Sequence, residues 1–149
     1  MLQPSRKALL ALEAIMDIAV HARPDPVQSR DITERQGIPK RYLEQAMQNL
    51  VRAGILKGVR GPRGGYRLAR ERRRISVGEI VRLVDGLDTQ TPTATSPLNQ
   101  KVLLPLWQEV QNDLIHRLDK VTLEDLYCRA QQEQIVVTTE STPQNDFTI

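Results

Sequence analysis

The stretch IPKRYLEQAMQNLVRAGILKGVRGPRGGYRLA, Ile38 to Ala69, decides the fold. Its first half predicts a helix that runs to about Ala53, with Pro39 at an early helical position and Gly54 as the terminator. One face of this helix is apolar and is expected to pack on the core; it consists of Leu43, Ala46, Met47, Leu50 and Val51. The second half predicts two short strands, GILKGV and GYRLA, joined by the hairpin tip RGPRGG.

A shorter helix is expected just before this stretch. In SRDITERQG, Ser29 fits an N-cap and Gly37 fits the C′ position. A helix, a tight turn with glycine and a second helix form a helix-turn-helix, and a hairpin directly after it makes a winged helix. Residues 4–21 predict another helix, which is apolar on several faces and is therefore expected to be covered on several sides.

The part of the chain after the hairpin is expected to be helical with one polar interruption. SVGEIVRLVDG predicts a helix capped by Ser76, with Glu79 as its capping-box partner. A long helix is predicted over about residues 98–118. Its apolar seam alternates spacings of three and four, which indicates a helix packed along another helix, and it consists of Trp107, Val110, Leu114, Leu118 and Val121.

The expected fold class is mainly α with a small β-hairpin wing. We expect a winged helix-turn-helix DNA-binding domain over residues 1–86, a polar linker or effector loop over 87–101, a dimerisation helix region over 102–130 and a disordered tail over 131–149.

The charge of the chain is divided unevenly. Residues 1–75 contain 16 Lys+Arg and 7 Asp+Glu, a net charge of +9, whereas residues 76–149 contain 5 and 11, a net charge of −6. A basic first half joined to an acidic second half suggests a module that binds a polyanion such as nucleic acid.

The second helix of the helix-turn-helix and the wing offer side chains that read and hold DNA. Arg pairs with guanine, Gln pairs with adenine and Glu accepts from cytosine, although any exposed helix face is also polar. Arginines at the hairpin tip suit a narrow minor groove, and Arg67, Arg70, Arg72, Arg73 and Arg74 can follow phosphates. Glycine lets backbone approach closely. The expected DNA-binding residues are Ser29, Lys40, Arg41, Tyr42, Glu44, Gln45, Gln48, Arg60, Gly61, Arg63, Gly64, Gly65 and Tyr66.

Catalytic and metal-binding functions find little support in the sequence. His21 and His116 lie far apart without metal-ligand spacing, and His116 is expected at the surface. The hairpin tip lacks the Lys-Ser/Thr ending of a nucleotide-binding P-loop. Cys128 is the only cysteine, is expected to be quiet and partly buried, and fits a reducing cytoplasm. No stretch reaches the roughly 18 uncharged apolar residues that span a membrane.

The motifs YLEQ, RGPRGGY, SVGEIVRLVDG and PLW, with Lys7, Ala14, Asp17 and Ala19 in the first helix, together resemble the IscR/NsrR/CymR-type family of bacterial winged-helix transcription regulators. The resemblance covers about residues 5–127. It implies a homodimer in which the long helix crosses its partner and the wings flank a pseudo-palindromic operator. It also implies that Arg41, Glu44 and Gln45 read bases beside Tyr42, and that Arg60 enters the minor groove.

The chain differs from the iron–sulfur members of this family in the residues that would bind a cluster. Iron–sulfur members carry three cysteines between the helix ending in VDG and the long helix, whereas this segment has none and Leu104 stands where such members place a histidine. We therefore expect a cluster-free member that needs no cofactor.

The expected function is that of a cytoplasmic repressor, a homodimer that binds double-stranded DNA, with a metabolic enzyme or a small-molecule effector as a further partner. The alternatives are a basic adaptor that regulates a metabolic enzyme by complex formation and a nucleic-acid enzyme.

Overall fold

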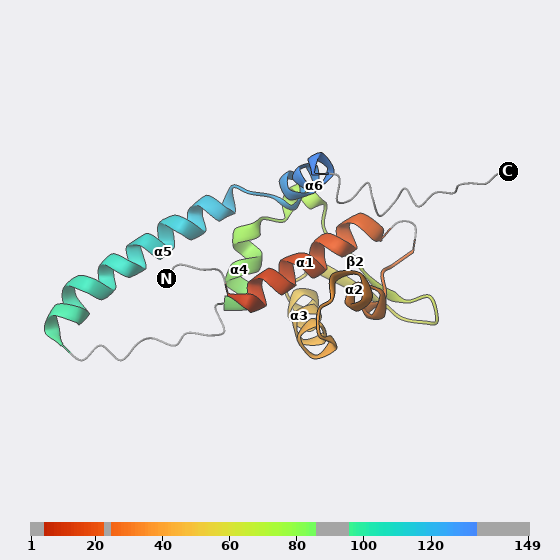
Figure 1. The fold of residues 1–149 in the computed structure, drawn as a ribbon, viewed down its shortest axis with the longest axis horizontal. Coiled ribbons are helices and arrows are strands. Elements are labelled where there is room, and N and C mark those ends of the chain that lie inside the picture. Colours follow the sequence, from red (N-terminus) through yellow and green to blue (C-terminus); the bar gives the residue numbers. More distant parts are fainter. Residues whose placement is uncertain (1–4, 23–24, 86–95, 134–149) are drawn as a thin grey trace.

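The computed structural model describes residues 5–22, 25–85 and 96–133, and it is mainly helical with one antiparallel hairpin (Figure 1). The expected fold class is confirmed. In chain order the elements are α1 (Arg6–His21), α2 (Ser29–Gln36), α3 (Lys40–Arg52), β1 (Leu56–Val59), β2 (Gly65–Leu68), η1 (Arg72–Arg74), α4 (Val77–Asp85), η2 (Asn99–Leu103), α5 (Leu104–Asp119) and α6 (Leu123–Gln132). Most of the tail expected over 131–149 and of the linker expected over 87–101 lies outside the described residues.

Helix α1 is the centre of the fold, because α2, α3, α4, α6 and β2 all pack against it. Its buried apolar residues are Ala8, Ala11, Ala14, Ile15, Ile18 and Ala19. In α3 the expected core face is confirmed at Leu43, Met47 and Leu50, which are buried. The expectation for Val51 is wrong: it lies at the edge of that face in the last turn, and its side chain is 37% exposed.

The helix starts differ by one residue from those expected. Ser29 is the first residue of α2 rather than its N-cap, because the backbone carbonyl of Gln28 already accepts from the amides of Asp31 and Ile32. Pro39 likewise precedes α3 instead of lying within it, since its ψ of 133° is extended. The C-terminal glycine of α2 is confirmed, because Gly37 adopts a left-handed φ of 67°.

The hairpin that follows α3 is fastened to the chain in front of α2. Leu56 pairs with Leu68 and Val59 pairs with Gly65 across the two strands. On the other side of β2, the amide of Val27 donates to the carbonyl of Tyr66 over 2.9 Å, and the amide of Tyr66 donates back over 2.7 Å. The wing is therefore held by a third, one-residue strand that the sequence patterns did not indicate.

A buried ion pair fixes α2 on α1. Asp17 is only 2% exposed although it carries a charge. Arg35 donates to both of its carboxylate oxygens, over 2.9 Å from Nε and 2.7 Å from Nη2, and Gln36 Nε2 adds a bond of 2.8 Å. The hydrogen bond to Asp17 also raises the pKa of the Arg35 guanidinium. Because these bonds satisfy the buried carboxylate, the charge does not disrupt the core.

The long helix leaves the body as an arm that is attached at its C-terminal end (Figure 1). A π-helical turn, η2, leads directly into α5, so the helix expected over 98–118 is confirmed. At the attachment the amide of Val77 donates to the carbonyl of Val121 over 2.8 Å, and the amide of Leu123 donates to that of Ile75 over 3.0 Å. Thr122 then starts α6 in a capping box with Asp125.

Within residues 5–22, 25–85 and 96–133, every helix falls short of the length and hydrophobicity that a bilayer crossing requires.

The buried ion pair yields a prediction about stability. Arg35→Ala leaves the Asp17 carboxylate buried and without its strongest partner, so we expect the free energy of unfolding to fall by about 3 kcal/mol, the lower end of the usual range because Gln36 still donates. Urea denaturation followed by circular dichroism measures this change. Arg30→Ala on the same helix, at an exposed position, serves as the control and should stay within about 0.5 kcal/mol of wild type. A similar small loss in Arg35→Ala would contradict the importance of the pair.

Candidate nucleic-acid interface

One face of α3 carries the expected base-reading side chains and is open to solvent. Its exposed residues are Lys40, Arg41, Glu44, Gln45 and Gln48, and Tyr42 beside them is also exposed. Lys40 Nζ lies 3.9 Å from Glu44 Oε1, a surface pair that contributes little to stability. The structure therefore brings these six residues together on the side of α3 opposite the core.

The tip of the wing is exposed and stands close to the start of α2. Arg60, Gly61 and Arg63 are exposed, and Gly61 has a φ of 113°, which only glycine adopts readily. Gln28 Nε2 donates to the carbonyl of Pro62 over 3.4 Å. Through this contact the half-buried Ser29, the first residue of α2, belongs to the same part of the surface.

The two glycines after the tip have a structural role that differs from the one expected. Gly64 is buried, and a methyl group on it would overlap the carbonyl oxygen of Val59 and lie 2.9 Å from the carbonyl carbon of Arg60. A methyl group on Gly65 would lie 2.6 Å from the carbonyl carbon of Val27. Both glycines thus permit close packing, Gly64 within the wing and Gly65 against Val27, and Tyr66 after them is half-buried against the core.

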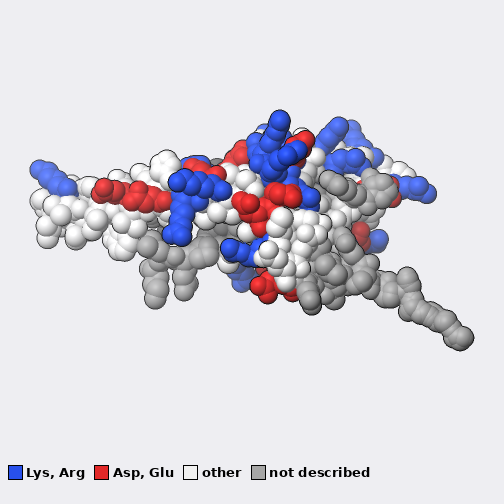
Figure 2. Space-filling view, turned by 90° about the horizontal axis from the view of Figure 1, so that it is seen from above, with Lys and Arg blue, Asp and Glu red and all other residues white. Residues whose placement is uncertain are grey.

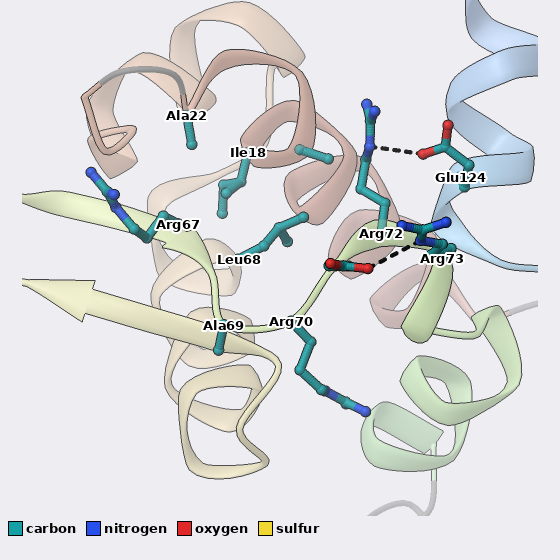
Figure 3. A pocket seen from close by; sticks show the side chains of 11 residues that line it. Ile18, Ala22, Arg67, Leu68, Ala69, Arg70, Arg72, Arg73 and Glu124 are labelled. Carbon is teal, nitrogen blue, oxygen red and sulfur yellow. Dashed lines mark hydrogen bonds and ion pairs between the residues drawn. The ribbon is translucent and has the colours of Figure 1, made fainter.

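Three of the arginines after the wing, Arg70, Arg72 and Arg73, form ion pairs with acidic side chains. Arg70 Nη2 lies 2.6 Å from Glu79 Oε1, and Arg73 Nε lies 3.0 Å from Glu71 Oε2. Arg72 is the most enclosed of the three, because its Nε lies 2.9 Å from a Glu124 carboxylate oxygen (Figure 3). Its guanidinium also lies 3.8 Å from the centre of the Tyr127 ring. Arg72 therefore fastens α6 to the body, and the expectation that it follows phosphates loses its support.

A groove of about 770 Å³ lies at the base of the wing, between the C-terminal end of α1, the end of β2, η1 and α6 (Figure 3). Its apolar lining is Ile18, Ala19, Ala22, Leu68 and Ala69, and its polar lining is Arg67, Arg70, Glu71, Arg72, Arg73 and Glu124. The acids among these residues offset part of the arginine charge. The groove joins the wing to α6 and carries no residue of the exposed face of α3.

The charge pattern agrees with an interface on the wing side of the molecule. In the view from above, most Lys and Arg lie over the half that carries the wing, whereas the long helix shows a row of acidic side chains with basic ones at its two ends (Figure 2). Such a separation directs a polyanion towards the basic half.

The arm exposes more apolar surface than the expected seam contains. Trp107 and Leu114 are 52% and 43% exposed, Val110 and Leu118 are half-buried, and Val121 lies beyond the end of α5. Further exposed apolar side chains, which the spacing pattern missed, are Leu98, Val102, Leu103 and Leu106. The signal for Val102, Leu103 and Leu106 was the run VLLPLW itself. Large exposed apolar patches are typical of association surfaces.

The histidines, the cysteine and the acidic side chains are the candidates for metal binding or thiol chemistry. Residues 5–22, 25–85 and 96–133 contain no group of three or more His, Cys, Asp or Glu side chains that could hold a metal ion. His116 is exposed, as expected. Cys128 is also exposed, so the expectation of a partly buried thiol is wrong; it lies on the outer side of α6, with Sγ 4.0 Å from Glu124 Oε1.

Comparison with known proteins gives a consistent picture. Residues 4–129 match the family described as Rrf2, iron-dependent transcriptional regulator. The HTH-type transcriptional regulator IscR of Vibrio cholerae is 35% identical over 124 residues, which is 80% of this chain and 72% of that protein. The solved structure of T. potens IscR is 38% identical, with a TM-score of 0.73 and coverage of 89% and 91% of the two chains. CymR of B. subtilis is 29% identical, with a TM-score of 0.68 and coverage of 87% and 98%.

Proposed function

Because the chain belongs to the Rrf2 family of transcriptional regulators, and is a DNA-binding regulator rather than an enzyme, we propose that it represses transcription as a homodimer on a pseudo-palindromic operator in the cytoplasm. The observation that supports this proposal most directly is that α3 and the wing are held in a fixed position relative to each other. The exposed face of α3 and the wing tip belong to one body, because Val27 joins β2 to the chain that leads into α2 and α3.

The side chains on the exposed face suggest a division of labour. Arg41 suits guanine, Gln45 suits adenine and Glu44 suits the amino group of cytosine in the major groove. Glu44 repels phosphate, so its role is to select among sequences rather than to add affinity. Arg60 and Arg63 at the wing tip suit the negative potential of a narrow minor groove.

The arm supports self-association. Two copies that pack their exposed apolar stripes against one another would remove Trp107 and Leu114 from water, and a pair of identical DNA-binding bodies matches a two-fold operator. The arm leaves the body at one end only, so its far part is accessible to a partner (Figure 1).

The iron in the family description does not fit a conventional cluster in this chain. Iron–sulfur clusters are held mainly by several cysteine thiolates, and this chain of 149 residues has one cysteine. That residue, Cys128, lies exposed on α6. Control of this regulator is therefore assigned to a partner protein, a metabolic enzyme among the candidates, or to a small-molecule effector, and not to a cluster.

The DNA-binding proposal predicts a specific loss at the wing. Arg60→Ala should weaken operator binding by about 1–3 kcal/mol, because a charged side chain leaves the minor groove. Fluorescence anisotropy with labelled operator, repeated over a range of salt concentrations, measures it; the wild type should show a log–log slope of roughly −0.9 per neutralised phosphate. Arg129→Ala, which removes an exposed arginine from α6, is the control. An affinity of Arg60→Ala equal to that of the control would speak against the wing, and a flat salt dependence would speak against polyanion binding altogether.

The dimer proposal predicts a loss of assembly. Leu114→Asp puts a charge into the apolar stripe, and we expect dimerisation to weaken at least about 100-fold, equivalent to roughly 3 kcal/mol. Sedimentation equilibrium gives the mass and the dissociation constant. Asn112→Asp introduces the same charge at an exposed polar position on the opposite face of the same helix and should leave the dimer intact. If Leu114→Asp kept the wild-type dimer mass, the stripe would not be the interface.

The cluster-free proposal predicts a colourless protein. Purified without air, the wild type should bind its operator without iron or sulfide, because the ligands for a thiolate-held cluster are missing. Absorbance spectra together with iron and sulfide analysis test this. Near-stoichiometric iron and sulfide with charge-transfer bands would overturn the proposal.

A further inference from the structure

The relation between the arm and the DNA-binding body is set at one small junction. Helix α5 packs against the body chiefly through α4, which follows the wing and η1 (Figure 1). The far part of the arm, from η2 to about Trp107, carries most of the exposed apolar surface. The proposed self-association surface therefore begins at the far end of the arm and continues through Leu114 towards the attachment.

A two-point ion pair at the surface, with the Arg82 side chain half exposed, joins the two helices beside the backbone bonds of this junction. Arg82 on α4 donates to both carboxylate oxygens of Asp119, over 2.6 Å from Nη1 and 2.7 Å from Nη2. Two parallel bonds fix direction as well as distance, which a single bond does not. The hydrogen bonds from Arg82 hold the pKa of Asp119 below its ordinary value, so the pair persists at neutral and mildly acidic pH and is lost only as the pH falls through that lowered pKa.

A glycine brings the two helices into direct contact beside this pair. Gly78 lies in the first turn of α4 and is buried. A methyl group on it would overlap the carboxylate of Asp119 and lie 2.8 Å from the Asp119 backbone nitrogen. The helices therefore meet at the closest distance that a glycine allows, and a side chain here would force them apart.

The length of the arm magnifies any change at the junction. Trp107 lies 12 residues before Asp119, which corresponds to about 18 Å of α-helix. A tilt of about 10° at the junction would move Trp107 by about 3 Å relative to the body. This displacement is close to the rise of one base pair, about 3.4 Å.

We propose that the junction between α4 and α5 determines the half-site spacing that the dimer accepts, through Arg82, Asp119 and Gly78. These three residues would thus contribute to operator specificity without touching DNA. The inference rests on the proposed dimeric regulator. Because the arms pack against each other along their exposed apolar stripes in that dimer, the angle between arm and body at each junction sets the separation of the two copies of α3. A dimer reads two half-sites only at a matching separation.

The first test uses the operator selected from random DNA by the wild type, with its spacer lengthened or shortened by one base pair. The wild type should lose about tenfold in affinity at either change, equivalent to roughly 1.4 kcal/mol. Arg82→Ala should lose less than about threefold, with unchanged affinity for a single half-site. Arg117→Ala, which removes an exposed arginine two residues from Asp119, should behave like the wild type. Arg82→Lys restores the charge but not the two-point bond, and should fall between the wild type and Arg82→Ala.

A second variant, Gly78→Ala, distinguishes a junction that has become flexible from one that is rigid but has a changed angle. Gly78→Ala adds a methyl group where it overlaps Asp119, while alanine favours the helix itself. Its preferred spacer should move by one base pair or more and remain sharp, whereas Arg82→Ala broadens the preference. An unchanged optimum in Gly78→Ala would overturn the inference.

The last test requires no DNA. A single nitroxide label at Glu34→Cys, an exposed position on α2, in a Cys128→Ser background reports the distance between the two bodies of the dimer. The wild type should give a narrow distance distribution and Arg82→Ala a broad one. Equal widths, or equal spacer profiles, overturn the inference and leave DNA binding intact. Failure of the wild type to bind DNA at all would instead overturn the proposed function.

Discussion

The buried carboxylate of Asp17 is the constraint on which the arrangement of the reading elements depends. Helix α1 is apolar on most sides, and a charge inside it is tolerated only because Arg35 and Gln36 bring the end of α2 to it. Once α2 is fixed, the left-handed Gly37 and the extended Pro39 direct the chain into α3. The Asp17–Arg35 pair thus orients α3. It also fixes the position of Val27, which lies in front of α2 and is hydrogen-bonded to the wing at Tyr66.

Glycines perform two different tasks in this molecule. Gly64 and Gly65 let the wing fold tightly on itself and on Val27, so the wing moves with the body. Gly78 lets α4 and α5 touch, so it governs how the body sits on the arm. The wing and α3 are consequently held rigidly with respect to each other, whereas the position of this body relative to the arm depends on a separate contact.

Local pattern was enough to predict the elements but not the partners of charged residues. The apolar spacing of α3, the hairpin tip and the long helix all indicated the observed fold, because these features repeat over a few residues. Asp17 contributed to the family resemblance, but its buried ion pair was not predicted, because its partner Arg35 is on another helix. Arg72 looked like a phosphate ligand, because nothing near it in sequence indicates Glu124 or Tyr127. The residue-level error at Val51 arose at the edge of a predicted face, and those at Ser29 and Pro39 at a helix end, where one residue decides the cap.

The one-residue strand at Val27 has a consequence for solubility. A two-stranded sheet has two unpaired edges, and such edges invite pairing with other chains. Val27 covers the outer edge of β2 at Tyr66. The other edge of the sheet is formed by β1, which is only four residues long and carries the charged Lys57. A chain that lost the Val27 bond would expose a short apolar edge next to its basic tip, and it would be prone to intermolecular β-pairing and fibrous aggregation at concentrations where the intact wing stays monodisperse.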